Sequence, residues 1–83
     1  MIFTVVWDRS CEQELAHLWV LGPERNAITA SVAAIDAKLR RDPLRHGESR
    51  SGNRRVLFQK PLAVEYEVEE DDRRVTVHAV WRY

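Results

Sequence analysis

The feature of this sequence that most constrains its fold is a pair of alternating segments near the C-terminal end. In residues 62–69 glutamates alternate with valines and a tyrosine, and in residues 74–82 apolar side chains recur at every second position. A period of two is typical of β-strands with one buried and one solvent-exposed face. Residues 70–73, Glu-Asp-Asp-Arg, favour a tight turn between the two segments. The sequence therefore predicts an antiparallel β-hairpin.

The alternation also predicts which residues face each other across the hairpin. If the turn has an even number of residues and neither strand has a bulge, the apolar residues pair with one another on one face. These apolar pairs are Val68–Val75, Tyr66–Val77, Val64–Ala79 and Leu62–Trp81. The pairs on the other face are Glu67–Thr76, Glu65–His78 and Ala63–Val80. Because the two faces agree with each other, we expect this register.

An N-terminal strand and a first helix precede the hairpin. Residues 2–7 are rich in β-branched and aromatic types, which is typical of a strand. Ser10 and Gln13 then form a capping-box pattern, in which each side chain satisfies a free backbone donor at a helix start. Gly22-Pro23 ends this helix, because glycine tolerates a left-handed cap and proline suits the first turn of the next helix.

The second helix has the clearest period in the sequence. Its apolar residues recur at intervals of four, three and four, and they are Ile28, Val32, Ile35 and Leu39. Small residues that would let the first helix approach closely are Ala27, Ala30, Ser31, Ala34 and Ala37. Asp42-Pro43 ends the helix, because a residue before proline is disfavoured in the helical conformation. We therefore interpret residues 10–41 as an antiparallel helical hairpin.

Residues 43–53 are polar, contain two glycines and have no periodicity, so we expect a mobile loop there. A strand at residues 55–60 follows, and Pro61 separates it from the hairpin. The predicted fold class is α+β, with an N-terminal strand, an antiparallel helical hairpin and a three-stranded antiparallel meander that completes one sheet (β-α-α-β-β-β). With 83 residues, the chain is expected to be a single domain over residues 1–83.

Composition excludes several classes of protein. No apolar run approaches the ~20 residues that a membrane-spanning helix needs, and the N-terminal segment lacks the basic start of a signal peptide. We therefore expect a cytoplasmic protein without membrane association. Cys11 is the only cysteine, which excludes an intrachain disulfide and a cysteine-rich zinc site. No metal and no cofactor are predicted.

Charge is balanced overall but unevenly distributed. Thirteen basic and thirteen acidic residues give a formal net charge of zero, so no global attraction to nucleic acid is expected. Basic residues concentrate between positions 38 and 55, and acidic residues between positions 65 and 72. The basic residues predicted to contact RNA or an acidic partner are Arg41, Arg45, Arg50 and Arg55; the alternative is a solvated helix end. Trp81 is the predicted apolar partner contact.

Two segments carry a resemblance to a known family. LRRDPLRHGESR, which begins at Leu39, and RRVLFQKPLAVEYEVEEDDRRVTVHAVWR, which begins at Arg54, resemble the end of the second helix and the sheet of the RelE/ParE toxin superfamily. The predicted order of elements agrees, and the resemblance covers essentially the whole chain. It implies the toxin of a type II toxin–antitoxin system of the plasmid-stabilisation type, which a cognate antitoxin binds and neutralises.

The resemblance implies more than one activity. ParE-like members inhibit DNA gyrase, whereas RelE-like members cleave messenger RNA in the ribosomal A site. We therefore expect a toxin that binds a target such as gyrase or the ribosome. The alternatives are a ribosome-dependent mRNA endoribonuclease and an inactive homologue that only binds its partner.

The nuclease alternative can be compared with the family residue by residue. The family's middle-strand arginine falls near Ala63, which cannot stabilise a phosphate. One position of its lysine pair falls at Arg54, and its late arginine corresponds to Arg82. His78 facing Glu65 would provide a general base with an orienting carboxylate, or alternatively a surface ion pair. The candidate catalytic residues are thus His78, Arg82, Arg54 and Glu65. Because Ala63 replaces the family's arginine, the resemblance does not decide whether the protein is an enzyme.

Overall fold

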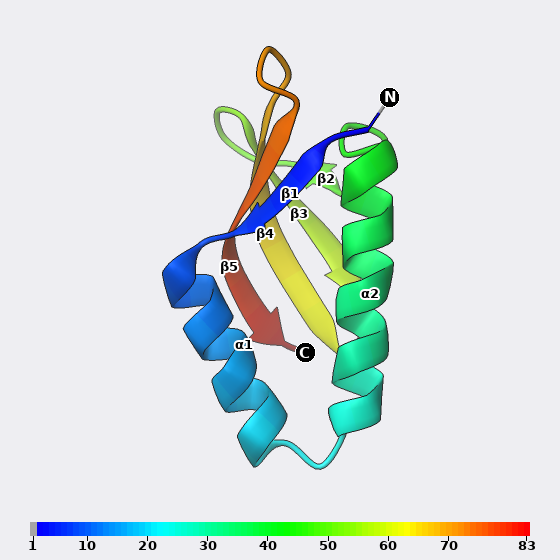
Figure 1. The fold of residues 1–83 in the computed structure, drawn as a ribbon, viewed down its shortest axis with the longest axis vertical. Coiled ribbons are helices and arrows are strands. Elements are labelled where there is room, and N and C mark those ends of the chain that lie inside the picture. The colour runs from blue at the N-terminus through cyan, green and yellow to red at the C-terminus, as the bar shows by residue number, and fades with distance from the viewer. Residues whose placement is uncertain (1) are drawn as a thin grey trace.

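The computed structural model describes residues 2–83 as one sheet with two helices (Figure 1). The elements are β1 (Thr4–Trp7), α1 (Arg9–Leu21), α2 (Arg25–Arg41), β2 (Glu48–Ser49), β3 (Arg54–Gln59), β4 (Leu62–Glu69) and β5 (Arg74–Arg82). The five strands have the order β1-β5-β4-β3-β2. β1 is parallel to β5, and the other neighbours are antiparallel. The predicted fold class is confirmed, and β2 is an additional short strand inside the expected loop.

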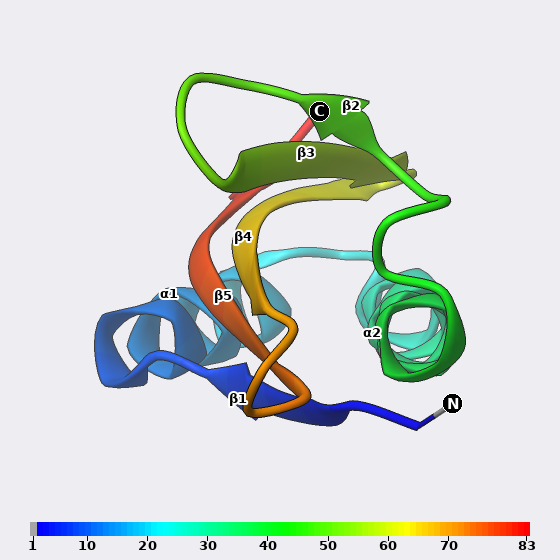
Figure 2. The same cartoon turned by 90° about the horizontal axis from the view of Figure 1, so that it is seen from above.

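The two helices pack on the sheet and make little contact with each other. α1 contacts β5, whereas α2 contacts β1, β3 and β4. Figure 2 shows the helices well apart when the molecule is viewed from above. Ala27, Ala30 and Ala37, which were expected to permit close helix contact, are exposed. That part of the prediction is wrong, because each helix buries its apolar side against strands and not against the other helix.

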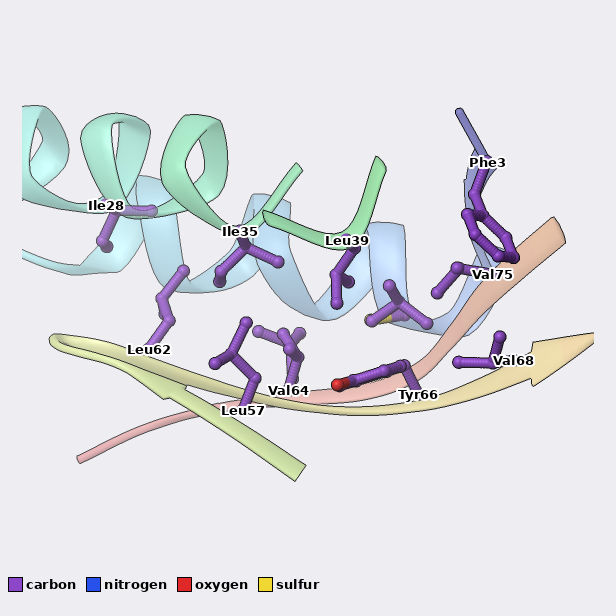
Figure 3. Packing of buried hydrophobic residues seen from close by; sticks show 13 residues of the cluster. Phe3, Ile28, Ile35, Leu39, Leu57, Leu62, Val64, Tyr66, Val68 and Val75 are labelled. Atoms are coloured by element: carbon purple, nitrogen blue, oxygen red, sulfur yellow. The ribbon is translucent and has the colours of Figure 1, made fainter. Parts of the chain in front are cut away.

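The apolar stripe of α2 forms the centre of the core, as its period predicts. Ile28, Ile35 and Leu39 are buried and lie over side chains of β4 such as Leu62 (Figure 3). Burial of each such side chain stabilises the fold by about 1.5–3 kcal/mol. Val32, the remaining member of the stripe, is only partly buried because it borders a groove between the helices.

Both ends of α1 differ from the predicted caps. Asp8 is the N-cap, and its carboxylate accepts hydrogen bonds from the backbone N–H and the hydroxyl of Ser10, at 2.9 and 2.8 Å. Gly22 ends the helix in extended conformation (φ −86°, ψ 149°) and not in a left-handed cap. A Cβ atom at this position would lie 2.8 Å from the Leu18 carbonyl oxygen, so glycine is required by close approach. Pro23 precedes α2, which begins at Arg25.

The hairpin of β4 and β5 has the predicted register only near its turn. Val68 faces Val75 and Tyr66 faces Val77, but the register shifts between Glu65 and Tyr66. Beyond the shift the observed pairs are Glu65–Ala79, Val64–Val80, Ala63–Trp81 and Leu62–Arg82, so four predicted pairs are wrong. His78 is the extra residue of a β-bulge, which moves every later residue of β5 to the opposite face.

The segment between α2 and β3 is anchored to the core. The buried Tyr66 hydroxyl lies 2.8 Å from the carbonyl oxygen of Pro43 and 2.7 Å from that of His46. Arg55 donates further hydrogen bonds to the carbonyl oxygens of His46 and Gly47. Pro43 itself is fully buried. Side chains from β3 and β4 thus hold the backbone of the first half of the expected loop, and the mobility of the segment stays a prediction.

Candidate functional site

One face of the sheet is turned away from the helices, and we call it the open face. Side chains alternate along a strand, so the residues between the core positions of β3, β4 and β5 lie on this face. They include Arg54, Val56, Phe58, Ala63, Glu65, Glu67, Thr76, His78 and Trp81. Polar side chains occupy the half of the face nearest the β4–β5 turn, and apolar side chains occupy the other half.

In the polar half, Arg54 pairs with Glu65. The Arg54 Nη1 atom lies 3.0 Å from Glu65 Oε1 across β3 and β4. Both side chains are about a third or more exposed, so the pair contributes under about 1 kcal/mol to stability. The structure brings these two predicted residues together, but it places Glu65 with an arginine and not with His78 as predicted.

His78 projects from the bulge and lies between two carboxylates. Its Nε2 atom is 3.2 Å from Glu67 Oε1, and its Nδ1 atom is 3.7 Å from Asp8 Oδ2. The imidazole thus joins β4, β5 and the N-cap of α1. The pKa of Asp8 is lowered chiefly by the hydrogen bonds from Ser10, with a smaller contribution from His78.

Arg82 lies on the opposite side of the sheet from these residues. Its Nη2 atom is 2.7 Å from Glu24 Oε2, at the connection between α1 and α2. The bulge at His78 causes this placement, because it exchanges the faces of the last residues of β5. The predicted grouping of Arg82 with His78 and Arg54 on one face is therefore wrong.

The predicted basic patch is divided between structural and exposed residues. Arg55 is occupied by backbone carbonyl groups, and Arg50 pairs with Glu48 at 3.3 Å. Arg41 and Arg45 are exposed, and no carboxylate among the described residues forms an ion pair with either of them. Only these two of the four predicted basic partner contacts present free charge.

In the apolar half of the open face, three aromatic rings surround a small residue. Phe58 and Trp81 flank the fully buried Ala63 in one row across β3, β4 and β5. The ring of Tyr83 meets that of Phe58 edge-on, with centroids 5.4 Å apart and planes at 76°. Lys60 Nζ lies 5.6 Å from the centroid of Tyr83. We call Phe58, Ala63, Trp81 and Tyr83 the aromatic shelf.

A groove between the helices is a second exposed apolar feature. It has a volume of about 440 Å³ and is lined by Glu12, Leu15, Ala16, Trp19, Val20, Ile28, Thr29 and Val32. The Trp19 Nε1 atom donates a hydrogen bond to Thr29 Oγ1 across it, at 3.3 Å. We call this the interhelical groove. The sequence interpretation missed it, although the apolar residues at positions 19–21 exceed what one helix face needs.

The described residues hold no grouping suited to a metal or to thiol chemistry. Within residues 2–83, no cluster of three or more His, Cys, Asp or Glu side chains is placed to bind a metal ion. Cys11 is buried, and burial raises the pKa of its thiol to about 11. A thiol with that pKa stays protonated near neutral pH and is a poor nucleophile.

Over the same residues, no helix is long and apolar enough to cross a membrane.

The arrangement of β1, the separated helices and the mixed sheet defines a known class of α+β protein. The chain superposes on the toxin–antitoxin complex RelBE2 of Mycobacterium tuberculosis with a TM-score of 0.82 and 20% identity, covering 100% of both chains. For the chromosomal ParDE system of P. aeruginosa the TM-score is 0.72 at 20% identity, covering 98% and 96%. For a mutant of E. coli toxin RelE in the free state it is 0.73 at 13% identity, covering 99% and 84%.

These likenesses specify the fold. The chain has the fold of the RelE/ParE toxins, as the sequence resemblance predicts. No protein-family model matches the chain, and no curated protein sequence matches it.

Proposed function

We propose that this protein is the toxin of a type II toxin–antitoxin system, that it acts in the cytoplasm by binding a target such as DNA gyrase or the ribosome, and that a cognate antitoxin neutralises it. The likeness to RelE and ParE structures over nearly the whole chain supports the toxin assignment. The observation that carries the binding mechanism is the internal neutralisation of the charged groups on the open face.

Phosphodiester cleavage without a metal needs cations that are free to stabilise the pentavalent phosphate. Arg54 is paired with Glu65, and Arg82 is turned away toward Glu24. Ala63 occupies the place that the resemblance gives to an arginine. The carboxylates beside His78 add negative charge where RNA would have to approach. This face is therefore better suited to a protein partner than to a phosphate backbone.

The interhelical groove supports binding of an antitoxin. It is apolar and open, and such grooves accept the apolar side of an amphipathic helix. Two of the structural neighbours come from toxin–antitoxin systems, RelBE2 and ParDE. We infer that an antitoxin helix occupies this groove and leaves the open face to the target.

The proposal is tested by inducing the protein in a bacterial host and measuring growth, with and without the small protein encoded beside its gene. Growth arrest that the neighbouring protein relieves is the expected result. Gyrase supercoiling and messenger-RNA integrity on translating ribosomes are then assayed with the purified toxin. Absence of arrest would contradict the toxin function and leave the binding-only homologue as the description.

The position of His78 favours one second candidate, the ribosome-dependent endoribonuclease. An imidazole held by Glu67 and Asp8 has the features of a general base with orienting carboxylates. If this candidate is correct, His78→Ala and Arg54→Ala abolish cleavage of messenger RNA on translating ribosomes. Cleavage that survives both substitutions would exclude these residues as the catalytic groups.

A further inference from the structure

We propose that the aromatic shelf, with Lys60 at its edge, is the docking surface for a segment of the target protein that presents an apolar side chain next to an acidic residue. The inference rests on the proposed function, because it names the surface through which such a toxin would hold its target. The surface is distinct from the interhelical groove, which lies on the helix side of the sheet.

The centre of the shelf is built by the register of three strands. Phe58, Ala63 and Trp81 face one another in a row on β3, β4 and β5. Ala63 has no exposed surface, whereas Phe58 is 45% and Trp81 38% exposed. A small buried residue thus lies between two large exposed ones in one row across three strands. We infer that the three residues form one apolar floor.

The third ring extends this floor and is held in place. Tyr83 is 48% exposed, its ring packs edge-on against Phe58, and its backbone N–H donates to the carbonyl oxygen of Pro61 at 3.0 Å. Aromatic side chains lose little conformational entropy on binding, and they are enriched among the residues that dominate interface energies. Exposed aromatic residues that are already ordered therefore favour a specific contact with a partner.

The charge at the edge of the shelf selects the chemistry of that partner. Lys60 lies over Tyr83, and within residues 2–83 no carboxylate is within ion-pair distance of its ammonium group. The arginines at the two ends of this part of the sheet, Arg54 and Arg82, are already neutralised by glutamates. One unpaired cation beside an apolar floor complements an acidic residue beside an apolar one. Single-stranded nucleic acid would require a groove with several free cations.

The test uses the full chain, purified DNA gyrase and purified ribosomes as probes. Phe58→Ser/Trp81→Ser and, separately, Lys60→Glu are expected to weaken binding to whichever probe the wild type binds by about tenfold or more. Lys60→Arg is expected to retain binding. Val6→Thr is the matched control, because Val6 is a similarly exposed apolar residue on the edge strand β1 and lies outside the shelf.

Each outcome separates the docking surface from the broader function. Thermal unfolding midpoints equal to that of the wild type establish that the variants are folded. If both shelf variants bind the probe as tightly as the wild type does, the proposed docking surface is overturned and the proposed function is unaffected. A wild type that binds neither probe and does not arrest growth overturns both. If the wild type binds a single-stranded RNA oligonucleotide and these substitutions abolish that binding, the proposal of a protein partner is overturned.

Discussion

A single hydroxyl group, that of Tyr66, connects the centre of the sheet to the segment that precedes β2. Two carbonyl oxygens surround it at hydrogen-bond distance, and burial raises the pKa of the phenol. Arg55 also donates a hydrogen bond to the carbonyl oxygen of His46. The carbonyl oxygen of Pro43 therefore depends more on the tyrosine hydroxyl for its hydrogen bond. Local order in a polar segment thus depends on a residue twenty or more positions away.

Replacing Tyr66 by phenylalanine should therefore destabilise the protein. The change leaves the carbonyl of buried Pro43 without this donor, and such a loss costs about 1–3 kcal/mol. Urea denaturation measures the difference in unfolding free energy. Tyr83→Phe is the control, because the Tyr83 ring is exposed. Loss of its hydroxyl group should change the free energy of unfolding by less than about 0.5 kcal/mol. Equal effects of the two substitutions would contradict the role of Tyr66.

Asp8 should make the stability of the fold depend on acid pH. Hydrogen bonds from Ser10 lower its pKa below the ordinary value of 3.8, so its stabilising contribution is complete above that value. The contribution is lost as pH falls through the lowered pKa of the folded state. The difference in melting temperature between the wild type and Asp8→Asn should shrink as the pH falls below 3.8. A difference that grows on acidification would contradict this sign.

At the scale of elements, the loop that carries β2 contains two glycines with similar backbones and different surroundings. Gly47 and Gly52 both have positive φ angles, of 76° and 67°. A Cβ at Gly47 would lie 2.7 Å from the carbonyl oxygen of Val56 and 2.8 Å from the Tyr66 hydroxyl, whereas nothing lies within 4 Å at Gly52. A substitution at Gly52 therefore tests backbone strain alone, whereas one at Gly47 tests backbone strain together with steric crowding.

Alanine substitutions at these two glycines should differ in their effect. Gly52→Ala should cost about 1–2 kcal/mol through the left-handed backbone alone. Gly47→Ala should cost about 1–3 kcal/mol more, because β3 and the core would have to shift. Chemical denaturation of both variants provides the comparison. Equal losses would show that the contact of this loop with β3 and Tyr66 is not tight.

The predictable part of the fold is the part set by local periodicity. The buried residues of α2 and the register next to the β4–β5 turn follow from spacing in the sequence. The bulge at His78 does not, because apolar residues continue on both sides of it and hide the change of face. The partners of His78, Glu65 and Arg82 all depend on that bulge, so their pairing could not be predicted without it.

At the scale of the whole molecule, two exposed apolar surfaces lie on opposite sides of the sheet. The interhelical groove lies on the helix side, and the aromatic shelf lies on the open face. The ion pairs across the polar half of the open face leave little free charge between these surfaces. If the proposed function is correct, we expect an antitoxin and a target to recognise different surfaces of this protein.

Two neighbouring residues of α1 test the groove as the antitoxin site. Val20 is 58% exposed and lines the groove, whereas Leu21 is 70% exposed and does not. Val20→Glu should weaken binding of the cognate antitoxin by about tenfold or more, because it places a charge against the apolar side of a helix. Leu21→Glu should have little effect. Calorimetric titration with the antitoxin measures both, and equal affinities would exclude the groove.

The bulge at His78 has an evolutionary consequence. Because His78 is the extra residue, deletion of its codon would remove the bulge and leave Trp81 and Arg82 on their present faces. Loss of the bulge at constant length would instead pair His78 with Glu65, return Arg82 to the open face and turn Trp81 inward. A change of register in one strand thus exchanges an aromatic surface for a cationic one, with the strand order and the chain length retained. Point substitutions that favour or disfavour the bulge offer this scaffold a short path between different targets.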